Sequence, residues 1–396
     1  MASLNILVLT AYPPALGVHG GAMRMYYNLR ILAAKHRVSL ISFIEHERER
    51  NLLRQLEVLG IEVISVLRSP VPSLNLWMPK PLEHNEFSSP EMAAQVRSVL
   101  ENQSFDVIQV EYLQMAQHVP RSASQFKILT LHEIGYANEL KILKQDRRFW
   151  AKAVKLYDWM IQLNYEIRFC RGFDSIVCMT DEDALILAEF VPTSKVHTIH
   201  IGVDSDFFDA GLKTGAAWAQ KRMLFVGNYR HKPNRESVYY FVRDVLPQIH
   251  LRIPEAEFWV VGANADMLDT DLLRANPKVR VEGYVEDIRP VYQDCAVFVA
   301  PILLGNGMRV KLLEAFSMGM AVVASSLGVQ GFCTQEGEQL LVADSTESFV
   351  SNTIQLLQNK ALCVDLGSKA RKLIREHYDW SVIGEQFLDL VEDCHG

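Results

Sequence analysis

Residues 300–315 run Ala-Pro-Ile-Leu-Leu-Gly-Asn-Gly-Met-Arg-Val-Lys-Leu-Leu-Glu-Ala, and this stretch decides the fold of the second half of the chain. The apolar run Val297–Pro301 predicts a buried strand, Gly305 and Gly307 bracket Asn306 in a turn, and a helix begins after the turn. A strand, a Gly-rich turn and a helix in this order place free backbone N–H groups and the positive end of a helix dipole at the carboxyl edge of a sheet. The stretch therefore predicts an α/β fold with an anion site at that edge.

Charged side chains follow the turn. Lys311 and Glu314 are three residues apart, so they share one face of the predicted helix. The ammonium group can meet a phosphate, and the carboxylate can accept hydrogen bonds from ribose hydroxyls. Arg309 adds a second cation near the helix start. The pattern favours a nucleoside diphosphate site, and an ordinary turn followed by a solvated ion pair is the competing interpretation.

The same alternation of short apolar runs and helical stretches continues along the chain, and it is typical of parallel sheets built from βαβ units. Predicted strands lie at Asn5–Thr10, Arg37–Phe43, Glu62–Val66, Asp106–Val110, Lys127–Leu131, Ser175–Met179 and Val196–Ile199, and again at Met223–Gly227, Glu257–Val261, Val279–Gly283, Val297–Pro301, Ala321–Ser325 and Leu340–Val342. Because a single core stops growing at about 250 to 300 residues, the 396 residues predict two Rossmann-like, doubly wound α/β domains.

A segment of small residues without strong periodicity, 210–219, is interpreted as the linker between the domains. We expect an N-terminal domain over 1–209, a C-terminal domain over 210–376, and a final amphipathic helix over 377–396 that packs back on the N-terminal domain. Residues 67–90 contain five prolines and predict a long irregular loop.

The composition excludes several classes of protein. The chain has 40 Lys and Arg against 47 Asp and Glu, a net charge of −7, which argues against nucleic-acid binding because counterion release rewards basic surfaces. The six cysteines are never closer than eight positions, so a redox or zinc spacing is absent, and we interpret them as buried side chains in a reducing compartment. No apolar run approaches the roughly 18 residues of a membrane span. We therefore expect a cytoplasmic protein.

Dispersed motifs give the chain a resemblance to a known family. They are His132-Glu133, Ile201-Gly202-Val203-Asp204, Gly227 with Lys232-Pro233-Asn234, Gly283-Tyr284-Val285-Glu286-Asp287, the stretch Gly305 to Gly331, and Tyr378-Asp379-Trp380-Ser381. Together they resemble the GT4 family of retaining glycosyltransferases with the GT-B fold, over nearly the whole chain. The resemblance implies two Rossmann-like domains facing a central cleft, with the nucleotide on the second domain and the acceptor on the first.

The resemblance also implies roles for residues of the second domain. Glu314 matches a ribose ligand, and Lys232 matches a diphosphate-binding lysine. Val285 and Glu286 match the loop that holds the nucleobase, and Gly307 belongs to the donor-site signature itself.

Two positions depart from the family pattern. Asn306 stands where the family has a Glu that contacts the donor sugar, which leaves the identity of the sugar open. Asn228 stands where the family has an Arg. Arg309 can offset the second departure, because any cation within reach of the pyrophosphate stabilises a departing nucleotide.

In the first domain, Gly20 and Gly21 precede a predicted helix, so the backbone can approach a ligand closely and the helix start can bind a diphosphate oxygen. A simple turn is the competing interpretation. His132 follows the strand Lys127–Leu131, at the edge where parallel strands present side chains to a crevice. It matches the family histidine that contacts the transferred sugar, and we assign it positioning rather than base duty.

Acidic pairs raise the question of a divalent metal, and they are Asp181 with Asp183, Asp204 with Asp206, and Asp269 with Asp271. Such pairs can bridge a cation to a diphosphate. Helix capping explains the first and third pairs, and the second belongs to the Gly-Val-Asp element near the hinge. We therefore expect metal-independent chemistry and no cofactor.

One helical stretch is rich in basic and aromatic residues, and it has two interpretations. Its residues are Lys141, Lys144, Arg147, Arg148, Trp150, Lys152, Lys155 and Trp159. It is a solvated helix face, or it rests on an anionic membrane leaflet at the inner face and presents a lipid-linked acceptor.

The sequence thus predicts a metal-independent, retaining glycosyltransferase that moves a sugar from a nucleoside diphosphate to a glycan, lipid-linked or small-molecule acceptor. The departing phosphate is expected to take the acceptor proton. A nonhydrolysing nucleotide-sugar epimerase and a catalytically silent nucleotide-sugar-binding protein remain as alternatives, the second because of Asn306. A dinucleotide oxidoreductase is disfavoured because the glycine fingerprint is incomplete. The oligomeric state stays open.

Overall fold

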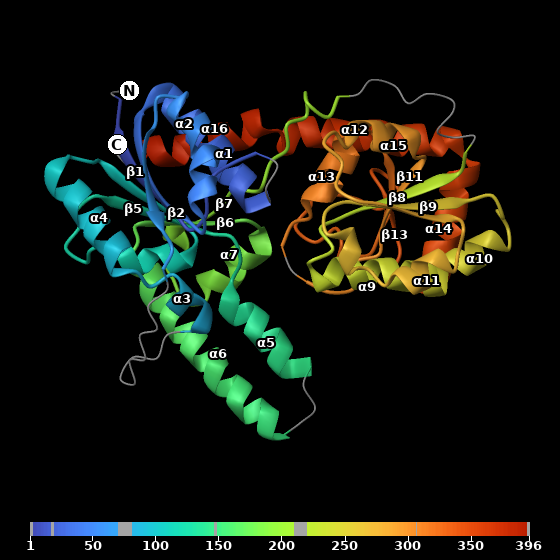
Figure 1. The fold of residues 1–396 in the computed structure, drawn as a ribbon, viewed down its shortest axis with the longest axis horizontal. Coiled ribbons are helices and arrows are strands. Elements are labelled where there is room, and N and C mark those ends of the chain that lie inside the picture. Colours follow the sequence, from blue (N-terminus) through green and yellow to red (C-terminus); the bar gives the residue numbers. More distant parts are fainter. Residues whose placement is uncertain are drawn as a thin grey trace. The chain divides into compact units, whose positions relative to one another are not determined.

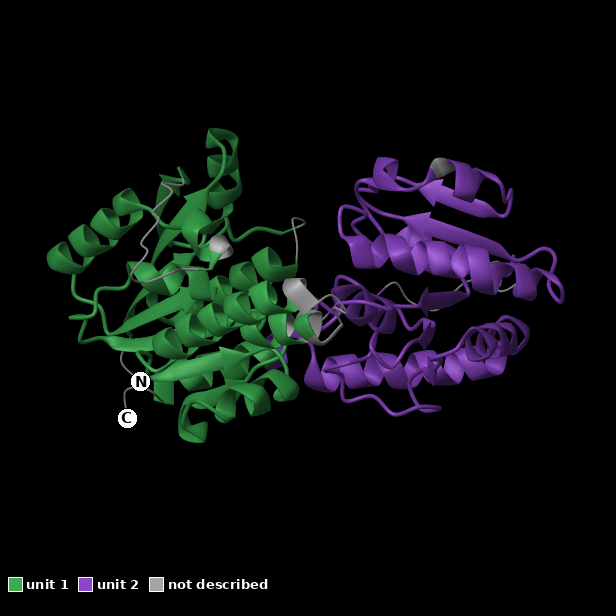
Figure 2. Ribbon diagram, turned by 90° about the horizontal axis from the view of Figure 1, so that it is seen from below, with its two compact units in different colours: residues 1–201, 383–396 green, residues 202–382 purple. Residues whose placement is uncertain are grey.

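A computed structural model describes residues 3–16, 20–69, 81–145, 149–209, 220–305 and 307–393. The chain forms two compact units (Figure 2): unit 1 consists of Met1–Ile201 with Ile383–Gly396, and unit 2 consists of Gly202–Val382. The predicted linker, 210–219, lies outside the described residues.

Unit 1 is built on a seven-stranded sheet in the order β3-β2-β1-β4-β5-β6-β7, and every pair of neighbours is parallel (Figure 1). The strands are β1 (Asn5–Thr10), β2 (Arg37–Ile44), β3 (Glu62–Leu67), β4 (Val107–Glu111), β5 (Phe126–Leu131), β6 (Ser175–Cys178) and β7 (Val196–Thr198). The strand order reverses beside β1, as in a doubly wound sheet. This confirms the predicted fold of the first half.

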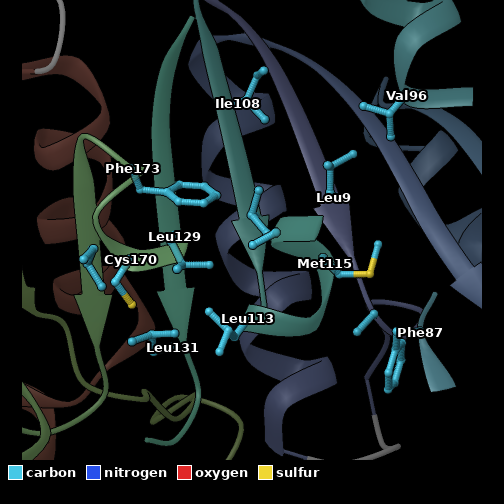
Figure 3. Close-up of a cluster of buried hydrophobic side chains, with 14 of the residues drawn as sticks. Leu9, Phe87, Val96, Ile108, Leu113, Met115, Leu129, Leu131, Cys170 and Phe173 are labelled. Carbon is cyan, nitrogen blue, oxygen red and sulfur yellow. The ribbon is translucent and has the colours of Figure 1, made fainter. Parts of the chain in front are cut away.

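The central strands β1 and β4 are buried at every residue except Asn5, as expected of a parallel sheet that helices cover on both faces. The helices are α1 (Gly20–Lys35), α2 (Arg50–Glu57), α3 (Leu82–Glu86), α4 (Pro90–Asn102), α5 (Gly135–Gln145), α6 (Phe149–Cys170), α7 (Asp181–Ala188) and α16 (Trp380–Asp393). Figure 3 shows the core on one face, where Leu9, Ile108 and Leu129 of the strands meet Val96 of α4 and Cys170 of α6.

Unit 2 has a six-stranded parallel sheet in the order β10-β9-β8-β11-β12-β13. Its strands are β8 (Arg222–Val226), β9 (Glu257–Val261), β10 (Val279–Glu282), β11 (Val297–Ala300), β12 (Ala321–Ala324) and β13 (Leu341–Val342). Its helices are α9 (Lys232–Tyr240), α10 (Leu246–His250), α11 (Thr270–Arg274), α12 (Arg289–Asp294), α13 (Val310–Ser317), α14 (Thr346–Gln358) and α15 (Lys360–His377). All predicted strands are confirmed, each within two residues of its predicted ends.

The boundary between the units lies after Ile201, eight residues before the predicted end of the first domain at 209. Residues 202–209 join unit 2 because they contact the segment that precedes α16. Val203 pairs with Asp379, whose carboxylate accepts a hydrogen bond from the Ser205 N–H at 3.1 Å. Asp209 forms ion pairs with two arginines of α15.

The C-terminal residues 383–396 belong to unit 1. Within that unit, Gly384 of α16 faces Ile31 of α1 so closely that a Cβ at residue 384 would lie 2.0 Å from Ile31 Cδ1. Glu392 of α16 lies 3.8 Å from the Lys35 ammonium and 3.4 Å from His36 Nε2.

Two smaller predictions were wrong. The expected irregular loop 67–90 contains α3 and the start of α4. Helix α4 begins at Pro90, which is favourable in a first turn, and Ser89 Oγ caps the helix by accepting a hydrogen bond from the Met92 N–H at 3.2 Å. Residues 70–80 lie outside the described residues. Cys333 is exposed, although the other described cysteines are buried. No helix among the described residues is long and apolar enough to span a membrane.

Helix α1 approaches the ends of β4 and β5 through a glycine. Tyr112, the residue after β4, has a positive φ of 73°. Its ring stacks on His132, which follows β5, with ring centroids 3.7 Å apart and an angle of 4° between the planes. A Cβ on Gly21 would lie 2.0 Å from the Tyr112 hydroxyl oxygen and 3.3 Å from His132 Nδ1. The tight packing of Tyr112 therefore requires a glycine at residue 21.

We expect Gly21→Ala to destabilise unit 1 by about 1–3 kcal/mol, because the added methyl would lie 2.0 Å from the hydroxyl oxygen of the stacked tyrosine and force that ring to shift. Calorimetry should show the unfolding transition of unit 1 lowered by roughly 3–10 °C. Tyr112→Phe is the matched background, since it removes the oxygen and leaves Cζ, 3.2 Å from the added methyl, as the nearest tyrosine atom. An equal loss in both backgrounds would contradict this account.

Candidate functional site

In unit 2, the residues predicted to bind an anion lie where β8 and β11 end. Asn234 of α9 joins the two helices that follow these strands: its amide donates to the Asn228 carbonyl at 2.8 Å, and its Oδ1 accepts from Lys311 Nζ of α13 at 2.7 Å. The Lys311 nitrogen also lies 4.2 Å from the centre of the Phe225 ring. A Cβ on Gly227 would lie 3.2 Å from the same nitrogen. The fold thus holds one lysine nitrogen against the edge of the sheet.

The environment of Lys311 disfavours its charge. Burial, followed by the repulsion of the Arg309 guanidinium, lowers the pKa of Lys311 to about 7, although Glu314 acts in the opposite direction. At neutral pH the charged and neutral forms of this amine are therefore both populated. A bound anion would favour the charged form.

Glu314 lies one turn further along α13, as the spacing predicted. Burial raises the pKa of Glu314 to about 7, against the opposing effects of Tyr292 and Lys311. The Tyr292 hydroxyl of α12 donates to Glu314 Oε2 at 3.0 Å, so one carboxylate oxygen is already oriented. Sequence analysis missed Tyr292, because a tyrosine in an amphipathic helix is indistinguishable from a core residue.

The turn before α13 has the geometry that its glycines predicted. Gly305 and Gly307 have φ values of 101° and 77°, a region that side chains rarely adopt. Arg309 is the N-cap of α13, and its Nη1 donates to the Gly307 carbonyl at 2.8 Å. Burial lowers the pKa of Arg309 below that of a free arginine. Asn306 lies outside the described residues.

The other predicted donor-site residues lie in unit 2 with fewer contacts. Lys232 is exposed in the first turn of α9. Asn228 Oδ1 accepts hydrogen bonds from the Arg230 N–H at 3.0 Å and from the Asn264 amide at 2.8 Å, so this side chain shapes the loop after β8. In the loop after β10, Val285 is half-buried and Glu286 is exposed. Their ligand contacts stay predictions.

In unit 1, His132 belongs to a buried polar cluster that sequence analysis did not foresee. His132 Nε2 lies 2.8 Å from Glu111 Oε2, and the other oxygen, Oε1, accepts from Gln109 Nε2 at 2.7 Å. Glu111 ends β4 and is buried. A signal was available, because the predicted strands 106–110 and 127–131 place residues 111 and 132 next to each other at one sheet edge. Gly20 and Gly21 begin α1, and the close contact at Gly21 is with Tyr112.

The acidic pairs have local structural roles. Thr180 Oγ1 accepts from the Asp183 N–H at 3.1 Å, and Asp269 Oδ1 accepts from the Asp271 N–H at 3.1 Å, so both pairs lie at capped helix starts as predicted. Asp204 Oδ1 accepts from the Phe207 N–H at 2.8 Å. Among the residues that the structure describes, no three His, Cys, Asp or Glu side chains gather as metal ligands.

Comparisons with known sequences show similarity to sugar-transferring enzymes over part of the chain. Residues 220–359 match the family model described as glycosyl transferases group 1. An uncharacterized 44.6 kDa protein in the cps region of Klebsiella pneumoniae is 22% identical over 95% of this chain and 96% of its own length. The phosphatidyl-myo-inositol mannosyltransferase of Mycolicibacterium smegmatis is 28% identical, and this match spans 49% of the chain and 51% of the relative.

Comparisons with solved structures agree on the fold. The sucrose-phosphate synthase of Thermosynechococcus elongatus has a TM-score of 0.72 at 15% identity and covers 98% of each chain. Anabaena HepE in complex with UDP and glucose has a TM-score of 0.70 at 13% identity, covering 98% of this chain and all of its own. The comparisons thus relate residues 220–359 to the glycosyl transferases group 1 model, and the described fold to that of GT-B glycosyltransferases.

Proposed function

We propose that the chain transfers a sugar from a nucleoside diphosphate to an acceptor with retention of configuration and without a metal. The observation that carries the proposal is the pair of Lys311 and Glu314 on α13, oriented by Asn234 and Tyr292 respectively. A cation for the diphosphate and a carboxylate for the ribose lie one turn apart, behind a turn whose two glycines have positive φ. HepE, whose fold is similar, was solved with UDP and glucose, which supports a nucleotide-sugar donor.

The proposed chemistry rests on charge rather than on a nucleophile. Breaking the bond to the diphosphate places negative charge on the leaving group, and preorganised cations lower the barrier by stabilising that charge. Lys311 and Arg309, at the start of α13, would supply two of these cations. Lys232, in the first turn of α9, would supply a third. The departing phosphate would take the acceptor proton. His132 would position the transferred sugar.

The acceptor is proposed as a glycan, a lipid-linked sugar or a small molecule. The mannosyltransferase relative carries a lipid in its name, which favours the lipid-linked class. Helix α6 supports this choice with exposed apolar side chains at Val154, Tyr157 and Met160, beside exposed Lys152 (Figure 1 shows α5 and α6 side by side, extending from unit 1). The structure does not describe most of the other basic side chains in the stretch predicted to face a membrane.

Binding of UDP or GDP at pH 8 should take up about half to one proton per site. The free Lys311 amine, with a pKa of about 7, is mostly neutral at this pH, and a bound diphosphate raises the pKa and protonates it. Titration calorimetry in Tris and in HEPES measures the uptake from the difference in binding enthalpy. A panel of nucleotide sugars, screened by thermal stabilisation, identifies the preferred donor beforehand.

Lys311→Met should abolish this uptake and weaken binding by about 10- to 100-fold, since one charge-assisted hydrogen bond is lost. Lys372→Met is the matched control, because Lys372 is an exposed lysine of α15 in the same unit. Nucleotide binding without proton uptake by the wild type would refute the assigned role of Lys311.

The anomeric configuration of the product tests the reaction itself. NMR of the product formed from an α-linked donor should show an α-linkage, and an inverted centre would exclude the proposed same-face attack. Donor incubated without acceptor should stay unchanged, whereas an epimerase would convert it. Asn306→Glu, compared with the wild type, tests the silent-protein alternative: transfer by the variant alone would favour that alternative.

Flotation with anionic liposomes tests the membrane contact. Val154→Gln combined with Met160→Gln should reduce the bound fraction about tenfold or more, because each buried apolar side chain contributes about 1.5–3 kcal/mol. Val58→Gln with Leu251→Gln is the control, since these apolar side chains are 87% and 84% exposed elsewhere. Equal flotation of both variants and the wild type would contradict a docking role for α6.

A further inference from the structure

The polar cluster around Glu111 holds a charge inside unit 1. Glu111 is buried, with 1% of its surface exposed, yet both of its oxygens accept hydrogen bonds, from His132 and from Gln109. Burial, the largest influence, raises the pKa of this carboxyl. The His132 hydrogen bond and the charges nearby outweigh burial, so the pKa of Glu111 is lower than in water. The group is therefore a carboxylate at neutral pH.

Arg24 of α1 supplies the balancing charge. It is fully buried, and its Nη1 donates to the carbonyl oxygens of Ile199 at 2.9 Å and His200 at 2.6 Å. Burial lowers the pKa of Arg24 to about 10, which leaves it charged at neutral pH, and Glu111 acts to raise it. With a guanidinium as the counter-charge, the Glu111 carboxylate does not require a protonated histidine beside it.

This arrangement determines which nitrogen of His132 carries the hydrogen. An ionised carboxylate only accepts hydrogen bonds, so Nε2, 2.8 Å from Glu111 Oε2, must be the protonated nitrogen. Burial, the largest influence, lowers the pKa of His132, Arg24 lowers it further, and Glu111 opposes them. The ring is thus neutral, and Nδ1 keeps its lone pair. Nδ1 faces the first turn of α1, 3.3 Å from where a Cβ of Gly21 would lie.

The ring is held on its face as well as on its edge. Tyr112 stacks on it at 3.7 Å with parallel planes, which resists rotation of the ring out of its plane, and a 180° flip of the ring would break the hydrogen bond to Glu111. Among the described residues, the charged and titratable groups that face His132 are Glu111 and Tyr112 at the end of β4 and Arg24 of α1. About a tenth of the His132 side chain is exposed, which keeps it within reach of a ligand.

We propose that Glu111 is a positioning residue that locks His132 in the Nε2–H tautomer and presents Nδ1 as a hydrogen-bond acceptor. Such a nitrogen binds a hydroxyl group and offers nothing to a carboxylate. If the proposed function holds, the ligand group that binds His132 Nδ1 is a hydroxyl of a neutral sugar rather than the carboxylate of a uronic acid.

The tautomer can be measured without any substrate. Long-range ¹H–¹⁵N spectra of the full chain labelled with [¹⁵N]histidine distinguish Nε2–H, Nδ1–H and doubly protonated rings, and the loss of one signal in His132→Gln identifies the residue. We expect at least about nine-tenths Nε2–H at pH 7 in the wild type. In Glu111→Gln the amide can accept or donate, so the Nδ1–H form should rise several-fold. Glu111→Asp keeps a carboxylate and should largely restore the wild-type ratio.

His118 and His36 are internal controls in the same unit. His118 Nε2 lies 2.8 Å from the Phe87 carbonyl, and His36 Nδ1 accepts from the Leu4 N–H at 3.3 Å, so neither depends on Glu111. Their unchanged signals show that a variant is folded. If Glu111→Gln does not fold, the wild-type spectrum decides alone. A wild-type His132 that is doubly protonated or Nδ1–H at pH 7 overturns the proposal, and so does a tautomer ratio unchanged in a folded Glu111→Gln.

A kinetic comparison follows once the nucleotide screen has provided a donor. Glu111→Gln should lower kcat about 10- to 100-fold with little change in the KM for the nucleotide sugar, because a misplaced ring loses its contact with the reacting sugar and not with the nucleotide. Donors carrying a uronic acid should be poor substrates of the wild type. Transfer at the wild-type rate by Glu111→Gln overturns the proposal. If no nucleotide sugar is turned over, the proposed function fails, while the tautomer measurement still decides the role of Glu111.

Discussion

The hydrogen bond from Lys311 Nζ to Asn234 Oδ1 is the contact on which the arrangement in unit 2 depends. It joins α9 to α13, the helices that follow the adjacent strands β8 and β11, and a parallel sheet brings both helix starts to the same edge. The Phe225 ring and Gly227 lie against the nitrogen and replace part of its contact with water. Removing water makes the positive charge costly, so the site gains most from a ligand that brings a negative charge of its own.

Unit 1 holds a buried charge of the opposite sign, and it balances that charge internally. Glu111 lies at the end of a central strand, and the residues of the unit 2 site likewise lie after the ends of β8 and β11. In unit 1, however, Arg24 of α1 provides the counter-charge from within the unit. The two units therefore differ in whether the buried charge is balanced without a ligand. The cluster around His132 is preorganised, whereas Lys311 is only partly protonated at neutral pH, and a bound anion would favour its protonated form.

The sequence predicted those features that depend on neighbours along the chain. Strand positions followed from continuous apolar runs, because strands buried on both faces carry no polar alternation. Lys311 and Glu314 were found because helical spacing is local. Tyr292 and Glu314 are 22 residues apart, and their contact depends on how α12 lies beside α13, which the sequence alone does not reveal. Arg24 gave no signal, since a buried arginine that donates to carbonyls of a distant loop resembles any polar residue on a helix. Glu111 was within reach, because the order of β4 and β5 already places it beside His132.

Two exceptions to local rules meet at one point of unit 1. Tyr112 has a positive φ, which costs a non-glycine residue about 1–3 kcal/mol, and Gly21 lacks the side chain that would collide with the Tyr112 hydroxyl. The strain persists because the tyrosine ring stacks on His132 while its hydroxyl oxygen lies against Gly21. That packing fixes the plane of the imidazole, while Glu111 fixes its edge. Since the ring cannot turn without breaking one of these contacts, the two ring nitrogens are not interchangeable, and only Nδ1 is directed toward the start of α1.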